Sequence, residues 1–220
     1  ICSERQCCRL VCQFLKAVRR ATSGARQSRP VAIALLAITS GVDLGGFAGR
    51  LRTHLARHGR VAVVDAPSID QALRQPGLAH GVPGEFHADH AIGLHLDAVE
   101  AAHDFVLLIA DETATGWTQR CARRSDEVLL LADADQPPEV HAIERQCLRH
   151  ELGLAEAVET LVLLHPPDRR SPRHTHRWLD RRPVNHHVHL RPALARDMAR
   201  LARLLSGTAV GLVLAGGGAR

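Results

Sequence analysis

The fold is decided by the stretch Val31-Ala32-Ile33-Ala34-Leu35-Leu36-Ala37-Ile38-Thr39-Ser40-Gly41-Val42-Asp43. Its first eight residues form an uninterrupted apolar run, which is typical of a parallel strand covered on both faces. The polar turn that follows offers Ser40 or Asp43 as the N-cap of a helix that runs to His58. That helix has an apolar face made of Leu44, Phe47, Leu51 and Leu55. A strand, a short turn and an amphipathic helix predict an α/β fold.

The same alternation of strands and helices continues along the chain. We predict further strands at Val61–Val64, Phe105–Ala110, Glu127–Ala132, Thr160–Leu164 and His187–Leu190, the last at a sheet edge. The predicted helices are Ser68–Arg74, Ala88–Ala102, Thr118–Arg124, Pro137–His150 and Ala193–Leu205. We expect Gly59 to end the first helix in a left-handed conformation and Gly207 to close the last one. The predicted fold class is α/β, a mostly parallel, three-layer, Rossmann-like sheet with right-handed crossovers.

Both ends of the chain differ from this pattern. Ile1–Arg20 has apolar residues at helical spacing among basic ones, and Thr22–Arg29 is rich in Ser, Gly and Arg. We therefore expect residues 1–29 to be a connector helix and a linker, and residues 30–207 to be the α/β domain. Four cysteines lie in the first twelve residues without a C-x-x-C pair, so the spacing of a zinc site is not met. Because residue 1 is Ile, we expect a chain cut at both ends.

Three consecutive glycines follow a second apolar run near the end of the sequence. Val210–Leu214 is a predicted buried strand, and Gly216, Gly217, Gly218 and Arg220 come after it. Glycines leave their backbone N–H groups uncovered, so such a loop can hold a phosphate or the oxyanion of an acyl-transfer intermediate. The Walker pattern and the serine motif G-x-S-x-G are both absent from the sequence. A glycine-rich turn without chemistry is the alternative.

Composition sets further limits on function. The net charge is +5, and all but one of the 28 basic residues are Arg, which indicates the GC-rich genome of a bacterium. A modest basic excess permits contact with anionic lipid without requiring it. The longest apolar runs are too short for a membrane span, and no signal peptide is evident. We expect a cytoplasmic protein, with peripheral membrane contact compatible with its charge, and no nucleic-acid partner.

The order of elements resembles the MinD/ParA-type nucleotide-binding fold in a degenerate form. Ala102–Asp111 is similar to the carboxylate-bearing second strand of that fold, and Ser125–Leu131 to the next strand. The turn after the first strand, Thr39–Gly46, has no Lys, and its Asp43 would repel phosphate. Nucleotide hydrolysis is therefore not expected. We interpret Asp111 as a solvated carboxylate at a strand end, without a role.

The glycine loop resembles the start of patatin-like phospholipases. Several pieces, in order, are similar to the segment before the catalytic domain of neuropathy target esterase-type members: Phe105–Leu108, Gly116–Cys121, Ser125–Val128, Leu161–His165, Trp178–Arg182 and Leu201–Gly207. The resemblance implies that residues 208–220 begin a patatin-type α/β domain. It also implies that Gly216, Gly217, Gly218 and Arg220 form an oxyanion hole, with the Ser–Asp dyad encoded after Arg220. A cyclic-nucleotide-binding domain commonly precedes this segment in the family.

The expected function is thus the non-catalytic linking domain and oxyanion-loop start of a serine (lyso)phospholipase or esterase. Its substrate would be a phospholipid or lysophospholipid, no metal or other cofactor would be needed, and the 220 residues alone would be inactive. The alternative is a ParA/MinD-like nucleotide-sensing or protein-interaction module without hydrolase activity. ATP or GTP binding would favour this alternative.

Three other features have competing interpretations. His174, His176, His186, His187 and His189 form either a Zn²⁺ or Ni²⁺ site or a solvated basic loop, and the solvated loop is favoured. The basic run from Arg169 to Arg182 is either a surface loop or a contact for anionic headgroups. Trp117 and Trp178 are interpreted as packing anchors, with an interfacial position as the alternative.

Overall fold

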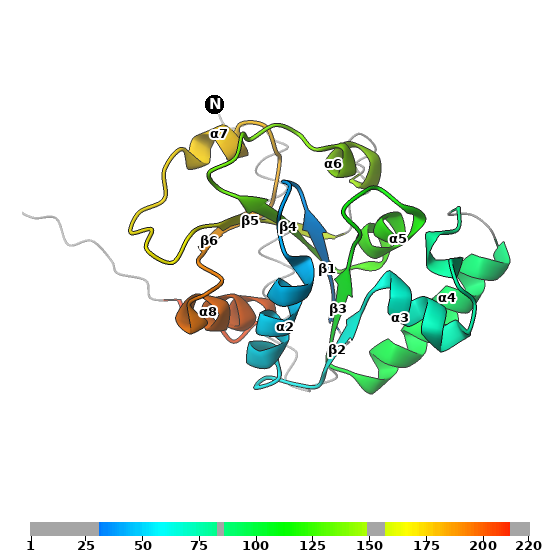
Figure 1. The fold of residues 1–220 in the computed structure, drawn as a ribbon. Helices are drawn as coiled ribbons and strands as arrows, with labels where there is room; N and C mark the ends of the chain where they lie inside the picture. The colour runs from blue at the N-terminus through cyan, green and yellow to red at the C-terminus, as the bar shows by residue number, and fades with distance from the viewer. Residues whose placement is uncertain (1–30, 83–85, 149–156, 212–220) are drawn as a thin grey trace, which may run out of the picture.

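Six parallel strands form one sheet in the order β2-β3-β1-β4-β5-β6 (Figure 1). The structure, a computed structural model, describes residues 31–82, 86–148 and 157–211. The strands are β1 (Val31–Ala37), β2 (Val61–Val64), β3 (Phe105–Ile109), β4 (Glu127–Asp133), β5 (Val158–Leu164) and β6 (His186–Leu190). All five strand pairings are parallel. The predicted strands between Val31 and Leu190, including the edge position of β6, are confirmed.

Helices cover both faces of the sheet (Figure 1). The described helices are α2 (Leu44–Leu55), α3 (Ala66–Leu73), the 3₁₀ helix η1 (Leu78–His80), α4 (Phe86–Ala102), α5 (Gly116–Arg124), α6 (Ala142–Cys147), α7 (Thr175–Leu179) and α8 (Ala195–Leu205). Side chains of α2 and α8 belong to the apolar cluster on one face, and those of α3 to α7 to the cluster on the other. The three-layer, Rossmann-like fold class is therefore correct.

Strand β1 lies at the centre because its apolar run supplies both clusters. Ile33 and Leu35 pack with α2 and α8, whereas Ala34 and Leu36 pack toward the opposite helices. All four side chains are fully buried. Successive side chains of a strand point to opposite faces, so a run without polar interruption is what a strand covered on both sides requires.

Gly59 does not end helix α2 in a left-handed conformation, so that prediction is wrong. Helix α2 ends at Leu55, and Gly59 does not have a positive φ. A Cβ at Gly59 would lie 2.7 Å from the Cβ of Asp104, the residue before β3. Asp104 also accepts a hydrogen bond from the Arg60 backbone N–H at 2.8 Å. Glycine is needed because the chain passes close to Asp104, whereas Gly207 after α8 does adopt the left-handed conformation, with φ of 67°.

The segment between β4 and β6 differs most from its prediction. Helix α6 spans only Ala142–Cys147, because His141 caps it and the prolines that precede His141 have no place in a helix interior. The short helix α7 forms inside a stretch that we expected to be irregular. It places Trp178 in the core, with 2% of its surface exposed.

Several predicted features lie outside the described residues: the connector helix Ile1–Arg20, the linker Thr22–Arg29, Leu212–Leu214 of the last predicted strand, Gly216–Gly218 and Arg220. Val210 and Gly211 are described and belong to no helix or strand. No helix in the described part of the chain combines the length and the apolar character needed to cross a membrane.

Candidate functional site at the carboxyl edge of the sheet

The loop after β1 lies where parallel α/β folds bind phosphates, at the carboxyl edge near the point where strand order reverses. Here the loop is fastened to the loop after β4. The Thr39 hydroxyl accepts a hydrogen bond from the Asp133 backbone N–H at 2.8 Å. Gln136 donates from its side-chain amide to the Ser40 carbonyl at 2.9 Å. The Ser40 hydroxyl donates to the side-chain carbonyl of Gln136 at 3.3 Å, so the hydroxyl groups of Thr39 and Ser40 both help to hold the two loops together.

The amino end of α2 is closed by the chain itself. Asp43 is its N-cap, and its carboxylate accepts a hydrogen bond from the Gly46 backbone N–H at 2.7 Å. A Cβ on Gly46 would lie 1.9 Å from a carboxylate oxygen of Asp43, so the cap needs glycine there. A carboxylate at this position satisfies a free N–H and the positive end of the helix dipole, as a bound phosphate otherwise would.

A hollow of about 380 Å³ adjoins this loop, and most of its charged groups are acidic. Asp43, Asp133 and Asp135 line it together with Arg50. The single lysine of the chain is Lys16, so no lysine is available from residues 31–211 to neutralise β- and γ-phosphates. Within the described ranges, no group of three or more His, Cys, Asp or Glu side chains is arranged to hold a metal ion. The loop after β1 therefore has the position of a phosphate-binding loop, but residues 31–211 do not supply the lysine that such a loop uses to bind phosphate.

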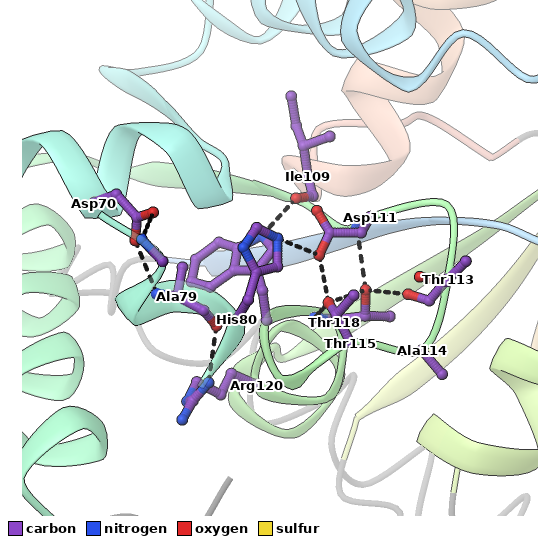
Figure 2. A network of polar contacts seen from close by, with 12 residues as sticks. Asp70, Ala79, His80, Ile109, Asp111, Thr113, Ala114, Thr115, Thr118 and Arg120 are labelled. Carbon is purple, nitrogen blue, oxygen red and sulfur yellow. Dashed lines mark hydrogen bonds and ion pairs between the residues drawn. The ribbon is translucent and has the colours of Figure 1, made fainter. Parts of the chain in front are cut away.

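Asp111, just after β3, is the centre of a polar network rather than a solvated carboxylate without a role (Figure 2). One of its oxygens accepts a short hydrogen bond from Thr115 Oγ1 and lies 3.2 Å from Nε2 of His80. Its backbone N–H donates to Thr118 Oγ1 at 3.1 Å. Because His80 ends η1 while Thr115 caps α5, the carboxylate joins the segment after α3 to the start of α5.

The segment Gly116–Cys121 packs α5 against β3 and against the loop after η1, next to this network. The indole N–H of Trp117 donates to the Ile109 carbonyl at 2.7 Å, and the side chain is completely buried. A Cβ on Gly116 would lie 2.1 Å from the Gly81 carbonyl oxygen, so only glycine permits this approach. Burial raises the pKa of the Cys121 thiol well above its usual value, which keeps the thiol protonated and unreactive.

Arg120 completes the attachment of η1 and α4 to α5. Its Nη1 donates to the Ala79 carbonyl at 2.9 Å (Figure 2). Its Nε donates to Asp89 of α4 at 2.7 Å, and Nη1 also donates to the Gly81 carbonyl at 3.0 Å. Asp70 of α3 accepts from the backbone N–H groups of Gly77 and Ala79. The segment that includes Gly116, Trp117, Thr118 and Arg120 is therefore explained by contacts within the fold.

Arg182 is buried, which corrects its assignment to a solvated basic run. It forms a two-pronged ion pair with Glu144 of α6, with Nε–Oε2 and Nη2–Oε1 distances of 2.6 and 2.8 Å. Its guanidinium also donates to the carbonyls of Pro138 and Glu139 and lies 5.0 Å from the ring centre of Trp178. Both tryptophans are buried, so the packing interpretation is correct and the interfacial one is wrong for this fold.

The predicted histidine cluster is brought together only in part. His187 and His189 contact edge to face, as do His174 and His176, with ring centres 5.8 and 6.4 Å apart. The main partner of His189 is His165, which we did not predict: the rings stack at 5.2 Å, and His165 Nε2 lies 2.9 Å from His189 Nδ1. His165 directly follows β5, and its proximity to the end of the neighbouring strand β6 was therefore inferable from the parallel order.

The His165–His189 pair gives a pH-dependent contribution to stability. Burial, followed by the neighbouring His165, His187 and Arg200, lowers the pKa of His189 to about 4, and burial likewise lowers the pKa of His165. A histidine with a folded pKa below its unfolded value contributes stability that is present above about pH 6.5 and is lost as pH falls toward 4.

We expect the urea concentration at the midpoint of unfolding to fall as pH is lowered from about 6.5 to 4, and to fall less in His189→Gln. The exposed strand neighbour His186→Gln should keep the wild-type slope, and an unchanged slope in His189→Gln would contradict the prediction.

Comparison with known families agrees with this geometry. The model of the Neuropathy Target Esterase family P-loop like domain matches residues 31–195, which are most of the sheet and its helices. The chain is 31% identical to patatin-like phospholipase domain-containing protein 7 of Rattus norvegicus over 214 residues, which cover 86% of this chain and 15% of that protein. An uncharacterized NTE family protein of Mycobacterium bovis is 31% identical over 203 residues, covering 89% of this chain and 30% of that protein.

Two further comparisons concern human and bacterial proteins. Patatin-like phospholipase domain-containing protein 6 of Homo sapiens is 35% identical over 147 residues, 55% of this chain and 10% of that protein. A solved plasmid partition protein from Borrelia burgdorferi superposes with a TM-score of 0.52 at 11% identity, covering 81% of this chain and 97% of that one. The second likeness bears out the predicted fold class. The chain spans 15% of the rat relative's length, so it corresponds to one part of a longer phospholipase relative.

Proposed function

The chain belongs to the Neuropathy Target Esterase family, and from this membership we propose that residues 30–207 form the non-catalytic linking domain of a serine (lyso)phospholipase. The observation that carries the proposal is the Asp43 cap on α2, which places a side chain of the domain itself at the helix end where folds of this type bind a phosphate. A domain that keeps the sheet but lacks the lysine and has engaged hydroxyl groups is suited to support, not to phosphoryl transfer.

In this proposal, Gly216, Gly217 and Gly218 supply backbone N–H donors to the oxyanion of an ester-hydrolysis intermediate, and Arg220 adds positive charge beside them. The nucleophilic serine and its aspartate partner are encoded after Arg220, in the patatin-type domain that residues 208–220 begin. The substrate is the ester bond of a phospholipid or lysophospholipid, and neither a metal nor another cofactor takes part. The names of the relatives support a phospholipase at the level of the family.

The cellular setting follows from the same proposal. A cytoplasmic location is supported by the buried free thiols of Cys121 and Cys147, which suit a reducing compartment. Contact of the whole protein with an anionic membrane surface is compatible with the net charge of +5. Regulation by a cyclic nucleotide, through a domain that precedes residue 31 in the family, is an expectation from the family alone.

The experiment compares the 220-residue chain with the product of the longer reading frame. We expect the longer product to release fatty acid from a lysophospholipid, and to lose this activity when the serine of its G-x-S-x-G motif is replaced by alanine. The 220-residue chain should release none and should not hydrolyse a nitrophenyl ester, because it lacks the nucleophile. Turnover by the 220-residue chain, or a longer product without a serine motif, would overturn the proposal.

The alternative function is a nucleotide-sensing module like the partition proteins whose fold it shares. Calorimetric titration of the 220-residue chain with ATP or GTP and Mg²⁺ separates the two. Saturable binding at millimolar nucleotide would favour the alternative, whereas the Asp43 cap and the absence of lysine from residues 31–211 predict none.

A further inference from the structure

A second hollow lies where β5 and β6 end and α8 begins, and it shares His165 with the hollow beside the β1 loop. Its volume is about 130 Å³, and four arginines line it: Arg169, Arg170, Arg191 and Arg200. His165 and His189 line it as well, and Asp197 is its one acidic lining residue. Guanidinium groups on several sides of a small hollow form the kind of site that takes an oxyanion.

The positive charge of this hollow is only partly neutralised within the fold. Arg191 forms a two-pronged ion pair with Asp197, at 2.8 and 3.2 Å, and Arg169 binds both oxygens of Asp135. Arg170 and Arg200 have no ion pair with any described carboxylate; Arg200 donates to the His189 carbonyl. Two exposed guanidinium groups therefore remain available at the rim of the hollow.

The two histidines His165 and His189 line the hollow, and one of their ring nitrogens has no hydrogen-bond partner. His165 Nε2 lies 2.9 Å from His189 Nδ1, and His189 Nε2 lies 3.2 Å from the Thr175 hydroxyl. His165 Nδ1 is buried and has no hydrogen-bond partner. If Thr175 donates to His189 and His189 donates to His165, the proton of His165 is on Nδ1, the ring nitrogen without a partner.

We propose that this hollow binds a phosphate group through the guanidinium groups of Arg170 and Arg200, beside the His165–His189 pair. Its volume is well below the roughly 300–1,000 Å³ of sites that enclose a whole small molecule, so it takes the phosphate and leaves the rest of the ligand outside. The phosphate belongs either to a soluble phosphate ester or to a lipid headgroup, since both present the same oxygens.

The charges around the two histidines support this assignment. Burial is the main cause of the lowered pKa of His165; Arg169 and Arg191 lower it further, and Asp135 and Asp133 oppose the shift. Burial is also the main cause for His189, whose pKa is lowered further by His165, His187 and Arg200. A bound phosphate adds negative charge beside the two histidines, so it raises the pKa of both. The pKa therefore reports occupation of the hollow independently of any enzymatic activity.

The test is a titration of the 220-residue chain with inorganic phosphate, followed by the NMR signals of the histidine rings as a function of pH. We expect saturable shifts of the His165 and His189 signals and a raised pKa for His189. Arg170→Gln and Arg200→Gln should each bind phosphate about tenfold more weakly, since each removes a charge-assisted donor. Arg57→Gln, an exposed arginine between α2 and β2, makes the same charge change away from the hollow and should bind like the wild type.

Two further binding experiments distinguish a soluble phosphate ester from a lipid headgroup. One uses glycerol 3-phosphate, and the other uses phosphatidylcholine vesicles with or without phosphatidic acid. Binding of glycerol 3-phosphate without vesicle binding assigns a soluble ester, and vesicle binding that Arg170→Gln weakens assigns a lipid headgroup. Equal shifts with chloride or acetate at the same ionic strength would overturn the proposal, as would an equal loss in Arg57→Gln or the absence of any response from the two histidines.

Discussion

Replacing Arg182 by leucine is expected to destabilise the domain by about 3–5 kcal/mol, because it leaves the buried carboxylate of Glu144 without its partner. Glu144 is 3% exposed, so water cannot replace the lost guanidinium. The carbonyls of Pro138 and Glu139 lose their donors as well. Since domains of this size are stable by about 5–15 kcal/mol, one unpaired buried charge would cancel a large part of the total. Urea unfolding followed by circular dichroism measures the change.

A double variant separates the buried charge from general damage to the core. Glu144→Gln with Arg182→Leu removes the charge, while the side-chain carbonyl of Gln can still accept from the His141 backbone N–H, as Glu144 does at 2.7 Å. We expect it to recover most of the lost stability. The neighbouring exposed Arg181→Leu should change stability by about 0.5 kcal/mol or less. A single Arg182→Leu variant as stable as the wild type would show that the pair contributes nothing.

Trp117→Ala should have an effect of similar size, about 3–5 kcal/mol, for a different reason. The side chain is completely buried between β3 and α5, and its removal leaves a cavity as well as losing apolar contact. It also removes the donor to the Ile109 carbonyl, which lies one residue before the loop that carries Asp111. Urea unfolding measures the loss, and ring signals of His80 report whether its contact with Asp111 persists.

Trp117→Phe divides this effect into packing and hydrogen bonding. Phenylalanine restores much of the volume but not the N–H, so we expect a residual loss of about 1–3 kcal/mol from the unpaired carbonyl. The matched control is Leu204→Ala on α8, whose side chain is 47% exposed and should matter little. The prediction fails if Trp117→Ala is no less stable than Trp117→Phe.

The sheet was predictable because its information is local. Each strand is a short apolar run, and an uninterrupted run such as Val31–Ile38 identifies a strand buried on both faces. The cap at Asp43 was among the expected alternatives for the same reason, since it involves the backbone only three residues away. The parallel pairing of the strands was also predictable from the pattern alone, because strands that alternate with helices pair in parallel through right-handed crossovers.

What could not be predicted depends on partners far apart in the sequence. Arg182 is one of several arginines in a polar stretch, and only the position of Glu144, 38 residues earlier, distinguishes it from its exposed neighbours. Gly59 is set by Asp104, and Gly116 by the Gly81 carbonyl, across loops with no recognisable spacing. No role could be predicted for Asp111, because its contact with His80 depends on the short helix η1, which the sequence pattern around it does not predict.

The carboxylate that Asp43 places at the start of α2 has a consequence for how this helix end is stabilised. A side chain of the domain itself accepts the Gly46 N–H, so this end of the helix needs no bound anion to satisfy that donor.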